Sequence, residues 1–549
     1  MERYRPRWPL LLTLIAGVGL VVLVAYVPSR EEGEARPALG GTYVEAVAGS
    51  PDAVNPLYAT FNEADADLSA LVFAGLVRLG PQGGVQPDLA EGYRVTPDGL
   101  TYIFELRSGL FWQDGEPLTA DDVVFTIGLI KDPGFDGDPS LAELFQDVAV
   151  EQPDDRTVTM TLQRPFAPFL ARGATVGILP EHLLRDVPAA ELADAAFNRG
   201  PVGSGPFRLT LLSSSQAVLE PYEDYHLGRP FLDRLEVRFY RDSGEVSSAL
   251  LEGEVDGALL RPGVDPDQIA TIDDDARLVR RSLHTTTLSL VYLNPRIGAF
   301  AEREVRQALQ HGLERAKLIA DVLDGQALEI DSPIIRELWA STSTPEAYAY
   351  DADVAASLLD EAGWRLEGGV RQKDGQRLSF RLAASDDPVQ SAIAQEIATQ
   401  WRALGIEVTP ETSGASQFVE NVLLPREFDA ALVSVDPGPD PDPYPLWHSS
   451  QLLGEGRNLA GFSDPGVDRL LENGRLTSSD AERASAYASF QEIFAREVPA
   501  VLLYTPTYEY VVRSDVQGLS PGLLYSLSAR FNDVQRWFIE TSRESSDGG

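Results

Sequence analysis

The sequence predicts a mixed α/β fold, because stretches with the period of a strand and stretches with the period of a helix are interspersed along it. Residues 101–106, TYIFEL, carry apolar side chains at every second position, as in a half-buried strand. Residues 305–323 repeat apolar side chains at steps of three and four, as in an amphipathic helix. Residues 393–408 combine both patterns, since a helical stripe stops at Gly405 and a new strand follows it. A chain of 549 residues is too long for one core, so roughly two or three domains are expected.

The first element is an uncharged apolar run at residues 10–27, LLLTLIAGVGLVVLVAYV. As a helix it would extend about 27 Å, nearly the thickness of the hydrocarbon core of a bilayer. Arginines precede the run and glutamates follow it, so the positive-inside rule keeps the N-terminus in the cytoplasm and exports the rest. A cleaved signal peptide is the alternative, but the run is long for such a peptide and no A-x-A site follows. We expect a signal anchor over residues 1–28 and a polar linker over residues 29–40.

Caps and spacing indicate further helices. Thr119 can cap a helix in which Asp122 completes a capping box before the apolar run VVFTIGLI. A helix is expected at residues 352–362, where Gly363 would form the C-terminal cap. Another is expected at residues 481–496, and it leads into the apolar strand PAVLLYTP. We find no internal repeat of 20 to 50 residues, which argues against a repeat architecture.

The charge balance excludes one class of partner. The chain has 84 Asp and Glu residues against 45 Lys and Arg, a formal net charge of −39 and a pI near 4.4. Such a field repels phosphate backbones, so no nucleic acid is expected as a partner. The absence of cysteine from the sequence excludes disulfides, thiolate metal sites, cysteine nucleophiles and lipid attachment through a cysteine.

Residues that commonly carry catalysis or bind metals form no recognisable motif. The five histidines are scattered, and no H-E-x-x-H occurs. The glycines of PVGSGPF, residues 201–207, lack the Lys-Ser/Thr of a P-loop, and no G-x-S-x-G is present. Acidic clusters at residues 121–122 and 273–275 are explained by a helix start and a solvated loop. We therefore expect no catalytic residue, no metal and no cofactor.

The stretch VDPGPDPDPYPLW, residues 435–447, has a proline at every second position from Pro437 to Pro445. A calcium loop is disfavoured, because proline freezes the backbone and the bidentate glutamate is absent. A rigid surface turn is one interpretation, since alternating prolines favour extended geometry. A ligand-facing loop is the other, because three acids and two aromatics on a stiff backbone can meet a cationic group at little entropic cost.

Seven segments are informative as an ordered set. The first is GTYVEAVAGSPDAVNPLYA, and the most specific is residues 87–127, PDLAEGYRVTPDGLTYIFELRSGLFWQDGEPLTADDVVFTI. They are followed by PVGSGPFRL, YHLGRPFLDRLEVRFY, GEVDGAL, YLNPRIGAFAEREVRQALQHGLERAKLI and DADVAASLLDEAGW. In this order they resemble the family 5 extracellular solute-binding proteins, the oligopeptide, dipeptide and nickel receptors of ABC importers. The resemblance runs from about residue 41 to about residue 518.

This resemblance implies a periplasmic-binding-protein-like α/β architecture, with two lobes, an interlobe cleft and an extra small domain inserted in the first lobe. The boundaries expected are residues 41–80, 201–285 and 507–540 for lobe 1, 81–200 for the inserted domain, 286–506 for lobe 2 and 541–549 for a disordered tail. Relatives are often lipoproteins, whereas this chain lacks the cysteine, so the helix at residues 10–27 would replace that anchor.

The resemblance also implies a function without bond chemistry. A peptide or other small solute would bind in the cleft, close the lobes, and be delivered to the permease subunits of an ABC transporter by a monomer anchored outside the cytoplasmic membrane. Asp436 falls where oligopeptide receptors bind the peptide α-amino group, and an apparent one-residue insertion makes Asp440 its alternative. The other ligand-binding residues expected are Tyr444, Trp447 and Asn294.

Two functions of other classes stay open. One is a secreted acidic hydrolase that resembles a glycosidase and uses two carboxylates, although the sequence identifies no such pair. The other is a receptor that senses its ligand without transport. Intact recovery of peptides or glycans after incubation would argue against the hydrolase.

Overall fold

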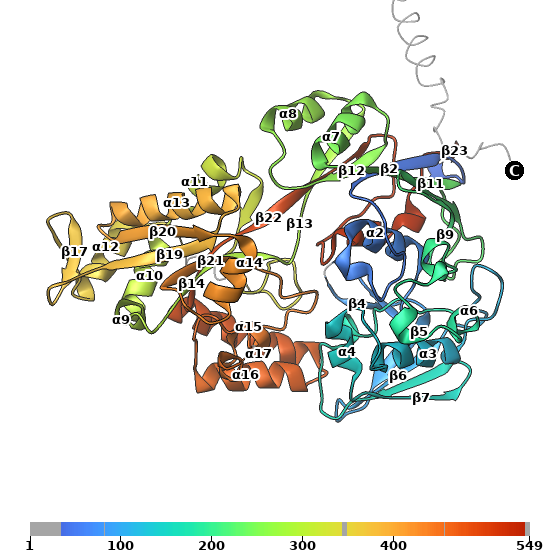
Figure 1. Cartoon of the computed structure of the whole chain (residues 1–549), viewed down its shortest axis with the longest axis horizontal. Helices are drawn as coiled ribbons and strands as arrows, with labels where there is room; N and C mark the ends of the chain where they lie inside the picture. The colour runs from blue at the N-terminus through green and yellow to red at the C-terminus, as the bar shows by residue number, and fades with distance from the viewer. Residues whose placement is uncertain (1–34, 82, 343–348, 455, 544–549) are drawn as a thin grey trace, which may run out of the picture.

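The computed structural model describes residues 35–81, 83–342, 349–454 and 456–543. The expected anchor at residues 10–27 lies outside these ranges. Among the residues that are described, no helix has both the length and the apolar character needed to cross a membrane. Helices and strands are interspersed through all four ranges, which confirms the mixed α/β class predicted from the sequence (Figure 1).

Most strands belong to one large mixed sheet. Its order within the described residues is β20 (Glu407–Ser413), β19 (Ser379–Ser385), β21 (Ala430–Val435), β14 (Leu288–Leu293), β22 (Ala500–Arg513), β12 (Gly257–Leu260), β2 (Thr42–Ala48), β11 (Arg234–Tyr240), β10 (Gln216–Pro221) and β9 (Phe207–Leu212). Two more strands, β13 (Leu278–His284) and β15 (Ala327–Glu329), also pair with β22.

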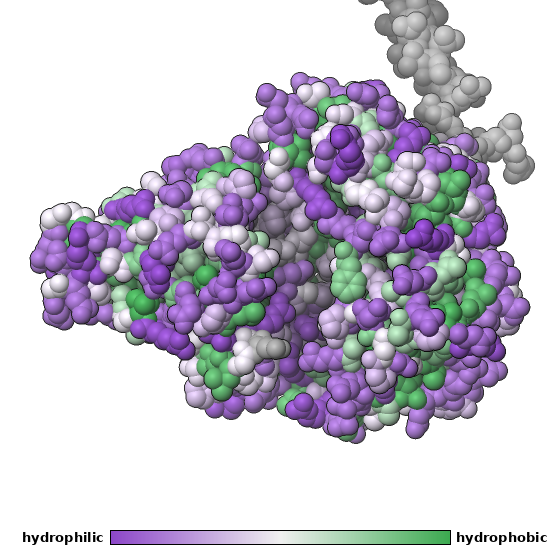
Figure 2. All heavy atoms as spheres, viewed as in Figure 1, coloured by the Kyte–Doolittle hydropathy of each residue, from purple (hydrophilic) through white to green (hydrophobic). Residues whose placement is uncertain are grey.

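The long strand β22 is shared by two halves of this sheet. Its first part pairs with β14 and β15, and its last part, from Thr507 onward, pairs with β12 and β13. We call the body around β2, β11 and β12 the first half and the body around β14, β19 and β21 the second half. The chain passes between the halves at residues 284–288 and again within β22 (Figure 1). Between the two halves the surface is hollowed (Figure 2).

Several helices begin where local sequence signals predict. Helix α3 (Ala120–Lys131) starts at the expected capping box, in which Thr119 Oγ1 accepts from Asp121 N–H and Asp122 Oδ2 accepts from Thr119 N–H. The two bonds satisfy backbone donors that a helix start leaves free. Other predicted elements are present as α12 (Ala352–Glu361), α13 (Pro388–Ala403) followed by β20, and α17 (Asp480–Glu497) followed by β22.

The helix predicted over residues 305–323 is wrong as a single element, because it is two helices, α10 (Arg303–His311) and α11 (Arg315–Val322). The chain turns at Gly312, which lies so close to Leu404 that a Cβ atom there would overlap the leucine side chain. Apolar residues on both sides of the turn still enter one core. The periodicity therefore identified the buried face but not the turn.

Residues 81–200, expected as an inserted domain, contain an antiparallel sheet. Its strands are β5 (Ala90–Val95), β6 (Thr101–Leu106), β8 (Thr157–Thr161) and β7 (Ala149–Asp154), and helix α4 (Pro139–Phe145) lies in the same segment. Tyr102 and Phe104 of β6 belong to the same hydrophobic core as Tyr43 and Val47 of β2. This segment therefore packs onto the first half through a continuous core, and the expected domain boundaries stay a prediction.

The ends of the described chain lie side by side. Strand β1 (Ala35–Pro37) pairs antiparallel with β23 (Thr541–Arg543), at the start of the segment for which a disordered tail is expected. The remainder of that expected tail lies outside the described residues.

Candidate functional site

Parallel strands β2 and β12 end side by side in the first half. Helix α2 (Glu63–Val72) packs into one hydrophobic core with Val47, whereas α7 (Ser243–Glu252) packs into another with Ala46. Because consecutive residues of a strand point to opposite faces, the two helices cover opposite faces of the sheet. A crevice outside the carboxyl ends of parallel strands, between such helices, is where open α/β sheets generally bind ligands.

The structure has a small pocket, partly open to solvent, at this position. The end of β2, Ser243 of α7 and four charged side chains line it. The charged residues are Glu63 and Asp67 of α2, Arg261 directly after β12, and Arg530 of the 3₁₀ helix η6 (Leu527–Phe531). The pocket thus combines both signs of charge from segments far apart in the sequence.

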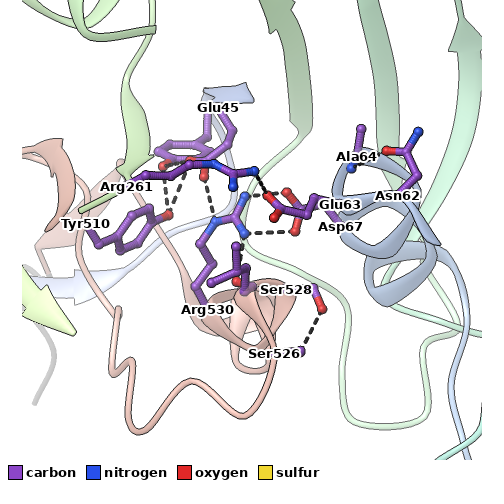
Figure 3. Close-up of polar contacts among 12 residues, drawn as sticks. Glu45, Asn62, Glu63, Ala64, Asp67, Arg261, Tyr510, Ser526, Ser528 and Arg530 are labelled. Atoms are coloured by element: carbon purple, nitrogen blue, oxygen red, sulfur yellow. Dashed lines mark hydrogen bonds and ion pairs between the residues drawn. The ribbon is translucent and has the colours of Figure 1, made fainter. Parts of the chain in front are cut away.

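Arg530 is buried beneath this pocket and is held by two carboxylates. Its Nε donates to Glu45 Oε1 at 2.8 Å, and its Nη1 and Nη2 donate to the two Asp67 oxygens at 2.8 and 2.5 Å (Figure 3). Glu45 also accepts from the hydroxyls of Tyr43 at 2.6 Å and Tyr510 at 3.3 Å. Burial lowers the pKa of Arg530, but Asp67 and Glu45 outweigh burial and raise that pKa above its ordinary value. The guanidinium is therefore charged, and the side chains of Glu45, Asp67, Tyr43 and Tyr510 fix its network in place.

Arg261 lies at the more exposed part of the pocket. Its Nη2 forms an ion pair with Glu63 Oε2, and both side chains are 45% exposed (Figure 3). An ion pair this exposed contributes little to stability, about 0 to 1 kcal/mol. Phe61, two residues before Glu63, has an aromatic side chain that is 64% exposed. Arg261 and Glu63 are accessible to a molecule that enters the crevice.

The second half contributes Asp436, which directly follows the carboxyl end of β21. The side chain is exposed, and its Oδ1 accepts from Thr286 Oγ1 at 2.6 Å and from Gly438 N–H at 2.8 Å. Thr286 belongs to the segment that passes between the halves, and Gly438 has a φ of 87°, which glycine adopts without strain. The carboxylate is thus fixed beside the crossing segment.

Tyr508 on β22 lies within electrostatic reach of charged residues from both halves. Burial raises the pKa of its half-buried hydroxyl, Glu63 and Asp436 raise it further, and Arg261 lowers it. Charged groups of both halves, Arg261 and Glu63 of the first and Asp436 of the second, thus act electrostatically on one side chain of the shared strand. A ligand between them would meet Asp436 on one side and the Arg261–Glu63 pair on the other.

Three of the other ligand-binding residues expected from the sequence are buried against protein groups. Asp440 forms an ion pair with Arg483 at 2.5 Å, with both side chains 5% exposed. Trp447 is fully buried in the core of the second half, between Tyr292 and Phe494. Asn294 is also buried, and its Nδ2 donates to the carbonyl oxygen of Phe428 at 2.7 Å, after the end of β14. Stabilising roles account for these contacts, and the ligand roles stay predictions.

Tyr444 is half-buried and already has a partner on each side of its ring. The guanidinium of Arg475 lies 3.8 Å from the ring centroid, and the His448 ring stacks at 4.0 Å. Arg475 also donates to Asp442, the third acid of the proline stretch, at 2.9 and 2.7 Å. Among the five residues expected to bind ligand, Asp436 is the one whose charged group is exposed, and it lies beside the crossing segment.

The site can hold charged groups, and its chemistry is that of ion pairs and hydrogen bonds. In the described ranges no group of three or more His, Asp or Glu side chains is arranged to hold a metal ion. Sequence reasoning missed Arg261, Glu63 and Tyr508. Arg261 could have been found, because it lies two residues after the GEVDGAL segment and directly follows β12, just as Asp436 directly follows β21.

The chain is similar to known proteins over most of its length. Residues 84–454 match the family described as bacterial extracellular solute-binding proteins, family 5 middle. The oligopeptide-binding protein AppA of Bacillus subtilis is 28% identical over 524 residues, which cover 93% of this chain and 94% of that protein. Protein XP55 of Streptomyces lividans is 32% identical over 479 residues, which cover 85% of this chain and 83% of that protein.

Solved structures are similar over a comparable length. AppA of Bacillus subtilis in complex with a nonapeptide has a TM-score of 0.67 at 26% identity and covers 92% of this chain and 100% of that one. The ABC transporter substrate-binding protein CtaP of Listeria monocytogenes has a TM-score of 0.76 at 26% identity and covers 91% of this chain and 100% of that one. The periplasmic-binding-protein-like fold is therefore shared.

Proposed function

Because the chain belongs to family 5 of the bacterial extracellular solute-binding proteins, we propose that it is the substrate-binding component of an ABC importer for a peptide-like solute. The observation that carries this proposal is the exposed carboxylate of Asp436 beside the segment that crosses between the halves. AppA of Bacillus subtilis, similar over nearly its whole length, is an oligopeptide-binding protein. The ammonium of a peptide N-terminus is the group that a fixed carboxylate binds by a charge-assisted hydrogen bond.

The mechanism that follows is hinge closure. The two halves are joined by the crossing segment at residues 284–288 and by β22, so they can move about these strands. A solute that contacts Asp436 on the second half and the crevice of the first half binds the closed arrangement better than the open one, and therefore increases its population. The permease would recognise the closed arrangement, and no bond of the solute is made or broken.

The family is extracellular, and the proposal extends to how this member is held there. The apolar run at residues 10–27 anchors it to the cytoplasmic membrane in place of a lipidated cysteine, and the folded part acts outside as a monomer. Lobe 1 comprises residues 41–80, 201–285 and 507–540, lobe 2 comprises 286–506, and residues 81–200 form the inserted domain.

Native mass spectrometry of the full chain, purified in mild detergent and mixed with short synthetic peptides, tests the proposal. We expect one intact peptide bound per chain, together with a smaller radius of gyration in X-ray scattering when peptide is added. Absence of any bound peptide would contradict the peptide-like class of solute. Recovery of cleaved peptides would contradict a pure binding function and favour the hydrolase. Binding with transport lost when the permease is deleted supports import rather than sensing alone.

A further inference from the structure

We propose that the pocket outside β2 and β12 is a subsite for a carboxylate of the solute, which replaces Glu63 as the partner of Arg261. This rests on the proposed function, because it assigns the second charged group of the same bound molecule. The subsite would select solutes that carry an anionic group at a distance from the ammonium held by Asp436. The carboxylate could be a peptide C-terminus or an acidic side chain.

The position of Arg261 is the first argument. It directly follows β12 and lines the pocket, and its charge, like that of Asp436 on the other half, reaches Tyr508 on the shared strand β22. Its guanidinium is a planar fork of donors that matches a carboxylate in two parallel hydrogen bonds. The pocket also offers the hydroxyl-bearing Ser243 as a further lining residue. An anionic group entering the crevice thus meets a suitable donor at the carboxyl end of the sheet.

The weakness of the present partner is the second argument. The pair of Arg261 with Glu63 is 45% exposed on both sides, so water and salt screen it. A solute enclosed between the two halves would be less solvated, and its pair with Arg261 would be stronger. Glu63 lies in the first turn of α2, where the positive end of the helix stabilises its charge after it releases Arg261. Exchanging Glu63 for a carboxylate of the solute as the partner of Arg261 therefore costs little free energy.

The fixed floor of the pocket is the third argument. The charge of Arg530 is compensated by Asp67 and Glu45, and none of these three side chains is more than 4% exposed. Asp67 and Glu45 are held in place by the packing of their own residues. A carboxylate of the solute lacks such packing, so it does not displace them from Arg530. Arg261 is thus the cation at this wall whose carboxylate partner is exposed and replaceable (Figure 3).

The test compares a mixture of short peptides with free C-termini and the same mixture with amidated C-termini. Each mixture is prepared with and without acidic residues, and the full chain in detergent is equilibrated with equal amounts of all four. The bound peptides are identified by mass spectrometry. For the parent, we expect peptides that carry at least one carboxylate to be enriched over peptides that carry none. Comparing amidated with free C-termini, and peptides with and without acidic residues, also shows whether the bound carboxylate is a C-terminus or an acidic side chain.

Two variants should act in opposite directions. Arg261→Gln should remove this enrichment, which corresponds to the loss of roughly tenfold or more in affinity for carboxylate-bearing peptides. Glu63→Gln should keep or increase the enrichment, because it leaves Arg261 without its competing carboxylate. Arg208→Gln is the matched control, since Arg208 forms an ion pair of similar exposure, 51% and 47%, with Glu220 on β9 and β10. Arg208→Gln should leave the enrichment of carboxylate-bearing peptides unchanged.

The failures are distinguishable. If the parent captures no peptide of any kind, the proposed function itself is contradicted, and this inference with it. If the parent captures peptides but does not prefer those with a carboxylate, the inference alone is overturned. The same holds if Arg261→Gln weakens the capture of all four mixtures equally, because Arg261 would then act through the shape of the crevice rather than on a carboxylate.

Discussion

Replacing the two aspartates of the proline stretch by asparagine, one at a time, should separate ligand contact from stability. Asp436 is exposed, and its Oδ1 accepts from Thr286 and Gly438, two bonds that an asparagine oxygen can also accept. The free energy of unfolding should therefore change by less than about 0.5 kcal/mol in Asp436→Asn. What the substitution removes is the charge that would meet a ligand ammonium.

The loss in affinity can be estimated from that single interaction. A hydrogen bond to a charged group contributes about 1.5 to 3 kcal/mol, which corresponds to a tenfold to hundredfold weaker Kd. Titration calorimetry with a peptide identified by native mass spectrometry measures this change directly. The same peptide with an acetylated N-terminus should bind the parent and Asp436→Asn equally, because it offers no ammonium.

Asp440→Asn is the matched control, since it makes the same chemical change four residues away. Its partner Arg483 is 5% exposed and lies 5.0 Å from the Trp339 ring, so the substitution leaves a buried guanidinium without its carboxylate. Breaking a buried pair costs about 3 to 5 kcal/mol, and we expect a lower midpoint of thermal unfolding with peptide affinity preserved below it. The reasoning is refuted if Asp440→Asn weakens binding while Asp436→Asn does not.

Three further outcomes are expected. A variant without residues 1–34 keeps β1 and should be folded and free of membranes, because the apolar run at 10–27 is the expected anchor; its recovery with membranes after a high-salt wash would count against that anchor. A chelator should leave thermal unfolding unchanged, since the described residues hold no cluster of metal ligands, and a loss of several degrees would reveal a structural metal. Contact with His284, whose Nε2 lies 2.9 Å from Oε2, lowers the pKa of Glu337. The contribution of Glu337 to stability is therefore present above the unfolded pKa of about 4.3 and lost as the pH falls through the lower folded pKa. The free energies of unfolding of the parent and of Glu337→Gln should thus converge in acid, and a difference that does not depend on pH would contradict this.

Local signals in the sequence predicted local structure well. The capping box of Thr119 and Asp122 is formed by short-range bonds, and it is found as predicted. Apolar periodicity reports burial on one face, and it identified α13 and α17 for the same reason. The turn at Gly312 escaped this reasoning, because the close approach that leaves no room for a Cβ atom there comes from Leu404, a residue distant in sequence.

The candidate site was predicted less completely, because long-range pairing decides which acid is free. Asp436, Asp440 and Asp442 look alike in the sequence, separated by prolines. The structure supplies Arg483 for Asp440 and Arg475 for Asp442, from helices that follow in the chain. No spacing rule indicates which acid those arginines reach. Similarly, periodicity cannot distinguish a tryptophan in a core from one that lines a pocket.

The division of these acids explains what the proline stretch contributes to the proposed closure. Two of them hold the stretch to the second half, while contacts from residues 81–200 reach it from the other side. Arg172 Nη2 donates to the Pro437 carbonyl oxygen at 3.4 Å, and Ala167 N–H donates to the Arg475 carbonyl oxygen at 2.8 Å. The Phe166 ring lies 5.3 Å from the Arg475 guanidinium.

These contacts join protein groups on both sides of the hollow, away from the crossing strands. They therefore favour the arrangement in which the halves meet, whatever the solute. A solute needs to contribute only the free energy that still separates the open from the closed arrangement, and its apparent affinity rises as these contacts reduce that difference. On this argument the stiffness of the stretch has a purpose beyond presenting Asp436. A backbone fixed by alternating prolines loses little entropy when it is docked, so the contacts to residues 81–200 and the contact to the ligand can form together.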